Sequence, residues 1–314
     1  MIVLDENYVN EHLDTGDCIA LMEKTLKQEE EGGCVQYMRT AINMPNHNIL
    51  GLMPAYFEEG YFGAKILSVY LSNHSTGYPS HQGQILLFEK EYGQVIACVD
   101  AMSVTKIRTG AVSAAASRYL ARPDSRHLAI LGCGVQGESH LAAISRVFPL
   151  EQVSVWDLYP DTARRFADRC QTAYGLPVTP YEDAALAVKD ADIICTVTPS
   201  STPVLKYSWL KPGVHINAVG ACSPQARELD GDITLHASFF GDSVESVMKE
   251  SGDFLIPLHE GLIQENHLKG TIGQIMNGKI QGRTGDDEIT VFEALGMAVE
   301  DIACAALLYR QAKQ

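Results

Sequence analysis

The chain has 314 residues, of which 46% are hydrophobic and 20% are charged, and its formal net charge is −15. This length predicts two domains at about 150 residues each, and an acidic chain without any basic run argues against a nucleic acid partner. Asp5 and Glu6 interrupt the apolar N-terminus, and no apolar stretch approaches the roughly 18 residues that span a bilayer, so we expect neither a secretory signal nor a membrane partner.

The first part of the chain predicts a mixed α+β domain. A short strand at Ile2–Leu4 precedes a helix that is capped near Asp14 and ends at Gly32. Short apolar runs separated by turn residues, at 63–70, 84–89 and 95–99, predict a mostly antiparallel sheet. An alanine-rich helix follows at 103–121, and the sequence Arg-Pro-Asp at 122–124 predicts a domain boundary.

From residue 127 the chain alternates between strand and helix patterns. Strands are predicted at 128–131, 152–156, 192–197, 214–219 and 237–240, and helices at 137–147, 161–173 and 181–188. Such alternation predicts a Rossmann-type doubly wound parallel sheet. A long apolar helix at 290–312 is expected to return to the first domain. The predicted fold class is therefore α/β, with a Rossmann-type domain at 122–289 and a second α+β domain formed by 1–121 and 290–314.

The most informative motif follows the predicted strand at 128–131. Gly132, Gly134 and Gly137 have the spacing G-x-G-x-x-G, and a helical pattern begins at once. The first glycine permits a tight turn, the second lets backbone amides approach a pyrophosphate, and the third lets the helix pack closely on the strand. Asp157 ends the next strand, near the roughly 20-residue offset at which an acidic residue binds the ribose hydroxyls. Strand, helix and acid together predict a dinucleotide site.

The eight cysteines are scattered along the chain, and they form no C-x-x-C pair. This usage favours small thiols in a reducing compartment. Neither a disulfide framework nor a zinc site is indicated. We therefore expect a cytoplasmic protein that holds no metal.

The chain resembles the ornithine cyclodeaminase/mu-crystallin family over nearly its whole length. The resemblance is carried by LMPAY (52–56), FGAKI (62–66), PSHQGQILLFE (79–89), KIRTGAVSAAASRYLA (106–121), LGCGVQG (131–137), HINAVGA (215–221), RELD (227–230), ESGD (250–253) and TVFEALGMAVED (290–301). It implies a homodimer whose first domain, with the C-terminal helix, binds substrate and dimerises. It also implies nicotinamide chemistry at a C–N bond of an α-amino or α-imino acid.

Three basic residues are candidates for a functional role, because an unpaired positive charge is costly in apolar surroundings. Lys65 lies inside an apolar strand, Arg108 lies in the small-residue helix, and Arg39 lies in the less distinctive sequence QYMRTAI. The residues alone leave a structural ion pair or a snorkelling side chain as open alternatives to a ligand role. The resemblance implies that all three bind the substrate carboxylate, for which a guanidinium fork is well suited.

A C=N reduction needs a proton at nitrogen as well as a hydride. Lys65 is the first candidate proton donor, acting directly or through water, because partial burial lowers the pKa of an amine. His81, in PSHQG, is the alternative donor, although a lone loop histidine is more often structural.

The segment at 217–224, NAVGACSP, departs from the family pattern. Members that act as cyclodeaminases resemble NAVGADxP here, and the aspartate handles the amino group or activates water. This chain has Cys222, and a thiol cannot replace a carboxylate as a base that holds an ammonium group. We keep Cys222 as a candidate catalytic position and interpret it as a small wall residue in preference to a nucleophile.

The cofactor expectation is NAD(H), with NADP(H) possible, because Asp157 would repel a 2′-phosphate. Arg164 and Arg165 could soften that repulsion, although such arginines more often form a solvated helix face. The candidate cofactor-binding residues are Thr109, Gly132, Gly134, Val135, Gln136, Gly137, Asp157, Thr196, Val197, Thr198, Val219, Gly220 and Thr290. Asp301, on the last helix, is expected to be structural.

The leading hypothesis is NAD(P)H-dependent reduction of a small imino acid, such as a cyclic ketimine carboxylate, to the amino acid. The alternatives are an ornithine cyclodeaminase, an alanine dehydrogenase-like reductive amination, and a non-catalytic mu-crystallin-like binding protein. Retention of Lys65 and Arg108 argues against the last, since a pure binding protein needs no proton donor.

Overall fold

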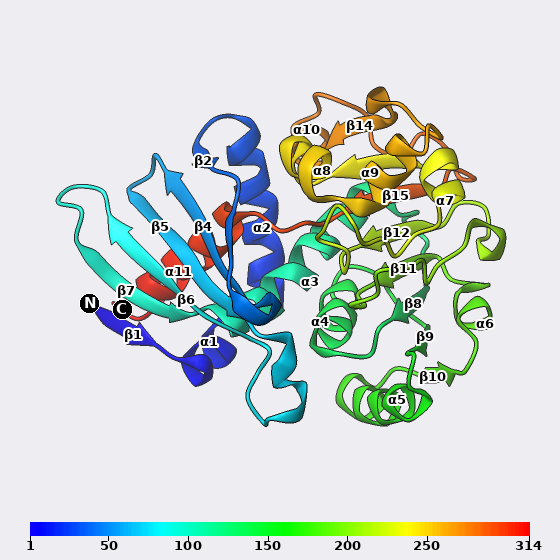
Figure 1. The fold of residues 1–314 in the computed structure, drawn as a ribbon, viewed down its shortest axis with the longest axis horizontal. Helices are drawn as coiled ribbons and strands as arrows, with labels where there is room; N and C mark the ends of the chain where they lie inside the picture. Colours follow the sequence, from blue (N-terminus) through cyan, green and yellow to red (C-terminus); the bar gives the residue numbers. More distant parts are fainter. The chain divides into compact units, whose positions relative to one another are not determined.

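The computed structural model describes residues 1–314, apart from the side chains of His74 and Ser75. The chain divides into two compact units, which Figure 1 shows as ribbons. Unit 1 comprises 1–108 and 296–314, and unit 2 comprises 109–295. The division falls within helix α3 (Ala101–Leu120), earlier than the boundary expected at 122–124.

Unit 1 contains a seven-stranded sheet in the order β1-β7-β6-β5-β4-β2, with β3 paired to β4. Only β1 pairs in parallel, with β7, and all the other pairings are antiparallel as predicted. The strands are β1 (Ile2–Leu4), β2 (Cys34–Gln36), β3 (Thr40–Asn43), β4 (Ile49–Phe57), β5 (Tyr61–Val69), β6 (His81–Glu89) and β7 (Val95–Asp100).

One face of this sheet is covered by the last helix, α11 (Ala298–Gln311), and α2 (Thr15–Glu30) packs beside α11. Figure 1 shows α11 in red across the strands. Met53, Lys65 and Ile85 face α11 in register on neighbouring strands, and all three are buried. Such alternation of buried and accessible positions is what a sheet with one covered face requires. The N-cap of α2 is Asp14, whose side chain accepts hydrogen bonds from Gly16 N and Asp17 N.

Unit 2 contains an eight-stranded sheet in the order β10-β9-β8-β11-β12-β15-β13-β14, and every pairing is parallel. Its central strands are almost wholly buried, as expected for a sheet covered on both faces, whereas the edge strands β10 and β14 are partly exposed. The strands are β8 (His127–Leu131), β9 (Gln152–Trp156), β10 (Val178–Tyr181), β11 (Ile193–Thr196), β12 (His215–Ala218), β13 (Ser238–Gly241), β14 (Leu268–Thr271) and β15 (Thr290–Glu293). The α/β fold class is confirmed.

The helices of unit 2 include three near the predicted ranges, α4 (Val135–Ile144), α5 (Pro160–Tyr174) and α6 (Ala184–Val188). Elements that the patterns did not separate are β10, β14, α1 (Glu6–His12), α7 (Gly231–His236), α8 (Val244–Glu250), α9 (Gly252–His259), α10 (Ile272–Met276), and the short 3-10 turns at Pro45–His47, Leu71–Ser75, Tyr207–Trp209 and Glu265–His267. Most of these elements are short, and a short element has too few residues to show a hydrophobic periodicity.

The prediction of one helix over 290–312 was wrong at its start. Residues Thr290–Glu293 form β15, which lies between β12 and β13, and α11 begins only at Ala298. The β-branched and aromatic residues of this segment suit a buried strand. Gly296, at φ 82°, takes a left-handed conformation that a continuous helix does not allow.

Among the described residues, the model contains no helix that is both long and apolar enough to cross a membrane.

Candidate functional site

The glycine motif forms the predicted turn between β8 and α4. Gly132 has φ 110°, a conformation that side chains other than glycine rarely adopt. A Cβ on Gly137 would lie 2.4 Å from the carbonyl oxygen of Gly132, so the helix packs against the turn only because this position has no side chain. Gly134 differs from both, because it is the N-cap of α4 and a Cβ there would meet nothing within 4 Å.

This turn fits the pyrophosphate of a dinucleotide. The space beside Gly134 is open, Val135 is 62% exposed, and the first amides of α4 point out of the helix end. At the end of β9, Asp157 accepts a hydrogen bond of 2.9 Å from Cys133 N, which holds the carboxylate against the glycine turn. An acidic group fixed there is placed to accept from ribose hydroxyls.

Arg164 forms ion pairs with carboxylates other than Asp157. Its guanidinium pairs with Asp161 and with Glu182, at 2.8 and 2.5 Å. The alternative of a solvated helix face is therefore the better description of Arg164.

A second group of predicted residues lies where β11 and β12 end. The two strands are adjacent and parallel, so Thr196 and Val197 emerge at the same sheet edge as Val219 and Gly220. This carboxyl edge is where doubly wound sheets bind their ligands. Thr198 is buried, and its backbone amide donates to Glu228, a residue that the sequence analysis did not single out.

Thr290 is placed differently from its prediction. It begins β15 and pairs in register with His215, at the amino end of β12, whereas the ligand-binding edge lies beyond Ala218. Its hydroxyl donates to the carbonyl oxygen of Leu120 and is wholly buried. Because parallel strands share one direction, a residue that starts a strand lies at the opposite edge from one that ends it. Thr109, the first residue of unit 2, is buried within α3.

In unit 1 Lys65 and Arg108 share the carboxylate of Asp301 on α11, and Arg108 also pairs with the neighbouring Glu300. Lys65 Nζ lies 2.7 Å from Asp301 Oδ2, and Arg108 Nε lies 3.2 Å from Asp301 Oδ1. Arg108 Nη1 lies 2.6 Å from Glu300 Oε2. All four side chains are at most 6% exposed. Burying such charges is tolerated because each is paired.

Arg39 joins this cluster through the backbone. Its Nη2 donates a hydrogen bond of 3.0 Å to the carbonyl oxygen of Gly296. A Cβ on Gly296 would lie 2.9 Å from the terminal nitrogens of Arg108, and at φ 82° a side chain there would also strain the backbone. The three cations singled out in the sequence therefore lie together.

The charge state of Lys65 is set by opposing influences. Burial is the largest and lowers its pKa, because an ammonium group loses its hydration. Asp301 opposes that shift by its charge and hydrogen bond, while Arg108 and Arg39 lower the pKa further. A lysine whose pKa is lowered in a group of charges is suited to exchange a proton.

Of the two remaining candidates, His81 lies apart from these groups, whereas Cys222 lies beside the end of β12 within unit 2. His81 begins β6, is exposed, and its Nδ1 lies 3.0 Å from the hydroxyl of Ser80. Cys222 is exposed, and its thiol lies 3.5 Å from the carbonyl oxygen of Val219. This contact with Val219 places the thiol beside the predicted cofactor loop.

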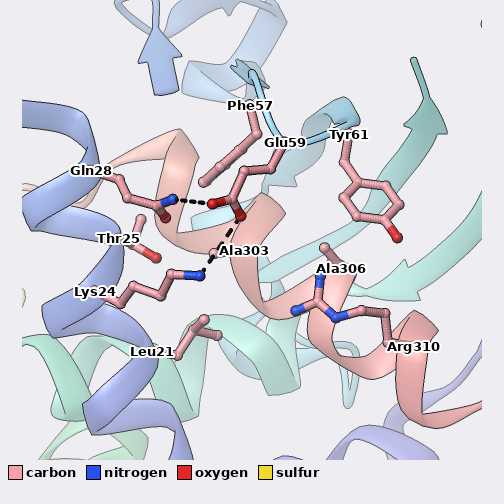
Figure 2. Close-up of a pocket in the computed structure, with 10 residues that line it drawn as sticks. All are labelled: Leu21, Lys24, Thr25, Gln28, Phe57, Glu59, Tyr61, Ala303, Ala306 and Arg310. Atoms are coloured by element: carbon pink, nitrogen blue, oxygen red, sulfur yellow. Dashed lines mark hydrogen bonds and ion pairs between the residues drawn. The ribbon is translucent and has the colours of Figure 1, made fainter. Parts of the chain in front are cut away.

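Figure 2 shows a hollow of unit 1 that contains none of the predicted site residues. In it Lys24 and Gln28 point toward Glu59, at 3.7 and 2.8 Å. The lysine and the glutamate pair at an exposed position, so this hollow lacks the buried ion pairs of the Lys65 cluster. Among the described side chains, no group of His, Cys, Asp and Glu is arranged to hold a metal ion.

A parallel sheet with this glycine turn and a fixed acidic residue defines the class of dinucleotide-binding α/β proteins. The comparisons with known proteins narrow this class. A sequence model of the ornithine cyclodeaminase/mu-crystallin family matches residues 1–314, and the chain belongs to that family.

Three relatives show where in the family the similarity lies. Ketimine reductase mu-crystallin of Mus musculus is 37% identical over 281 residues, which cover 89% of this chain and 86% of the relative. The structure of Thermococcus litoralis Delta(1)-pyrroline-2-carboxylate reductase in complex with NADH and L-proline has a TM-score of 0.97 at 34% identity, covering 100% and 98% of the two chains. An archaeal alanine dehydrogenase dimer with bound NAD has a TM-score of 0.94 at 29% identity, covering 99% and 95%.

Proposed function

We propose that the protein reduces the C=N bond of a small cyclic imino acid to the corresponding amino acid, with NADH as the cofactor. The observation that carries this proposal is the buried pair of Lys65 and Asp301 beside Arg108 and Arg39. This cluster combines a proton donor, Lys65, with two cations that can bind the substrate carboxylate. The similarity to a pyrroline-2-carboxylate reductase solved with NADH and L-proline supports the same reaction.

The cofactor would be held by unit 2 and would supply the hydride. The open amides at Gly134 and Val135 would bind its pyrophosphate, and Asp157 would accept from the ribose hydroxyls. The same carboxylate would repel a 2′-phosphate, so NADH is favoured over NADPH. Val197, Val219 and their neighbours at the ends of β11 and β12 would line the nicotinamide side.

The substrate would be held by unit 1. Arg39 and Arg108 would bind its carboxylate, since guanidinium groups suit two-point contact. Lys65 would give its proton to the imine nitrogen, directly or through one water, as the carbon accepts the hydride. Asp301 keeps the ammonium of Lys65 in place and charged before that transfer.

Cys222 favours reduction over cyclodeamination. A cyclodeaminase of this family is expected to need a carboxylate at this position, and a thiol does not hold an ammonium group. Reductive amination of a 2-oxo acid, as the similarity to an alanine dehydrogenase suggests, is the second candidate, because it requires the same cations and the same proton donor.

The open face of the unit 1 sheet supports a homodimer. Ile42, Leu50 and Leu52 share this face and are 52%, 36% and 38% exposed. Apolar residues gathered on an unpartnered face favour association with a second copy, and the similar alanine dehydrogenase is a dimer. Leu52→Asp is then expected to halve the mass measured by light scattering.

We also propose that the protein is cytoplasmic, since none of its cysteines forms a disulfide.

The deciding experiment follows absorbance of NADH as it is oxidised by cyclic imino acids of five- and six-membered ring size. Wild type should oxidise NADH with at least one of them, and Lys65→Met should reduce the rate by about 10²- to 10⁴-fold, as expected for loss of a general acid. The matched control is Lys90→Met, an exposed lysine of unit 1. Absence of NADH oxidation with every ring size would refute the proposal. Ammonia release from ornithine without net cofactor change would favour the cyclodeaminase.

A further inference from the structure

A buried glutamate connects the loops at the ends of β11 and β12. Glu228 is 0% exposed, and its Oε1 accepts from both the amide and the hydroxyl of Thr198, each at 2.6 Å. Its Oε2 accepts from the amide of Gly220 at 2.8 Å. One carboxylate therefore holds the second residue after each of two neighbouring strands.

The backbone of Glu228 is itself anchored by hydrogen bonds to two other segments of unit 2. Its amide donates to Asp253 Oδ1 at 2.8 Å, and its carbonyl oxygen accepts from the amides of Val204 and Leu205 at 2.7 and 3.1 Å. The loops also touch each other directly. A Cβ on Gly220 would lie 2.2 Å from the carbonyl oxygen of Thr198, and only glycine permits that approach.

This arrangement is more than a means to satisfy buried polar groups. An isolated carboxylate is costly to bury, and burial raises the pKa of Glu228 while the hydrogen bonds from Thr198 and Gly220 oppose that rise. A neutral acceptor would satisfy the donors at lower cost. The carboxyl group of Glu228 instead receives three short hydrogen bonds on its two oxygens, which hold both loops in one position, as a site for hydride transfer needs.

We propose that Glu228 is a positioning residue that fixes the Thr198 and Gly220 loops as the nicotinamide-side wall, an inference that rests on the proposed function. Glu228 does not touch the reacting atoms. It acts through the two loops, and therefore governs binding of the nicotinamide half of the cofactor without governing binding of the adenosine half at Gly134 and Asp157.

The test compares two ligands on Glu228→Gln. The amide keeps the shape of the side chain and replaces one acceptor oxygen by a donor, so either Thr198 or Gly220 loses its partner. The Kd for NADH, measured by fluorescence, should rise by about 10-fold, while the Kd for ADP-ribose, which lacks nicotinamide, should stay within about 2-fold. The deuterium isotope effect with NADH labelled at C4 should also increase, because hydride transfer becomes slower than the other steps.

Asp230→Asn is the matched control, because Asp230 lies in the same segment but its carboxylate binds the amides of Tyr207 and Ile233 and neither loop. It should leave both Kd values as in wild type. Equal weakening of both ligands by Glu228→Gln, or weakening of neither, would overturn the inference. If that variant does not fold, Thr198→Val removes the hydroxyl that donates to Glu228 and accepts from the amide of Ser200. It should show the same selective loss of NADH, and equal loss of both ligands would again overturn the inference.

Failure of the inference and failure of the proposed function are separate outcomes. A protein that reduces no imino acid, but whose Glu228→Gln variant selectively loses NADH, supports the inference and refutes the proposed reaction. If the wild type reduces an imino acid but the Glu228→Gln variant binds NADH as tightly as the wild type, the proposed reaction is supported and the inference is refuted. A wild type that binds neither ligand overturns both.

Discussion

Asp301 Oδ2 lies 2.7 Å from Lys65 Nζ, and both side chains are at most 4% exposed. The other oxygen of Asp301 faces Arg108 Nε at 3.2 Å, so one carboxylate serves two cations. Asp301 therefore determines where the ammonium of Lys65 lies and how strongly it holds its proton.

Asp301→Asn should move the alkaline limb of the pH profile of imine reduction to lower pH. Burial already lowers the pKa of Lys65, and the charge of Asp301 opposes that shift. Without this charge the pKa falls further, so the protonated donor is lost at lower pH, by about one pH unit. The measurement is kcat as a function of pH. Glu245→Gln, which removes the partner of exposed Lys249, is the control and should leave the limb in place. A limb that moves to higher pH would contradict this role.

Gly134→Ala should weaken NADH binding without weakening the fold. A methyl group there meets no protein atom within 4 Å, but it occupies the space where the pyrophosphate would approach the amides of α4. We expect the Kd for NADH to rise by at least about 10-fold, with an unchanged Tm.

Gly137→Ala is the matched comparison, because its Cβ would lie 2.4 Å from Gly132 O. It should lower the free energy of unfolding by about 1–3 kcal/mol, the cost of overpacking. If Gly134→Ala bound NADH as tightly as wild type, the turn would not be the pyrophosphate site.

Asp157→Asn should shift the preference between the two nicotinamide cofactors toward NADPH. The variant removes the charge that repels a 2′-phosphate but keeps an oxygen that can accept from Cys133 N. The ratio of kcat/KM for NADPH to that for NADH should rise by about 10-fold. Asp161→Asn, an exposed carboxylate of the following helix, serves as the control. An unchanged ratio would show that Asp157 does not select the cofactor.

The free energy of unfolding should decrease as pH rises from about 5 through neutral pH. Burial raises the pKa of Asp253, and the charge of Glu228 raises it further; burial and Asp253 do the same for Glu293. Unfolded carboxyl groups titrate near about 4. Between the unfolded and the raised folded pKa, the folded state binds more protons, so rising pH favours unfolding.

Asp253→Asn should flatten that pH dependence. The amide oxygen can still accept from the amides of Glu228 and Leu229, which now bind Asp253 Oδ1 at 2.8 and 2.7 Å, so the hydrogen bonds of the fold are kept. The check is urea unfolding at several pH values in parallel with wild type. A slope equal to that of wild type would show that Asp253 does not carry the extra proton.

The sequence alone was sufficient to predict the glycine turn, the parallel sheet and the position of Asp157 at the end of a strand. These features depend on residues close together in the chain. The positive φ of Gly132 and the apolar run before it are local properties, and strand–helix alternation limits the topology to few choices. The family assignment, which the comparisons confirm, likewise rests on contiguous motifs.

Only the tertiary structure decided which distant side chains meet. Asp301 was expected to be structural, and the folded chain places it against Lys65 and Arg108. Thr290 was expected at the ligand edge, and the direction of β15 places it at the opposite one. Glu228 gave no periodic signal at all, because a single buried acid in a loop has none. Periodicity reports which face of an element is buried, whereas ion pairs and loop contacts depend on how separate elements are packed.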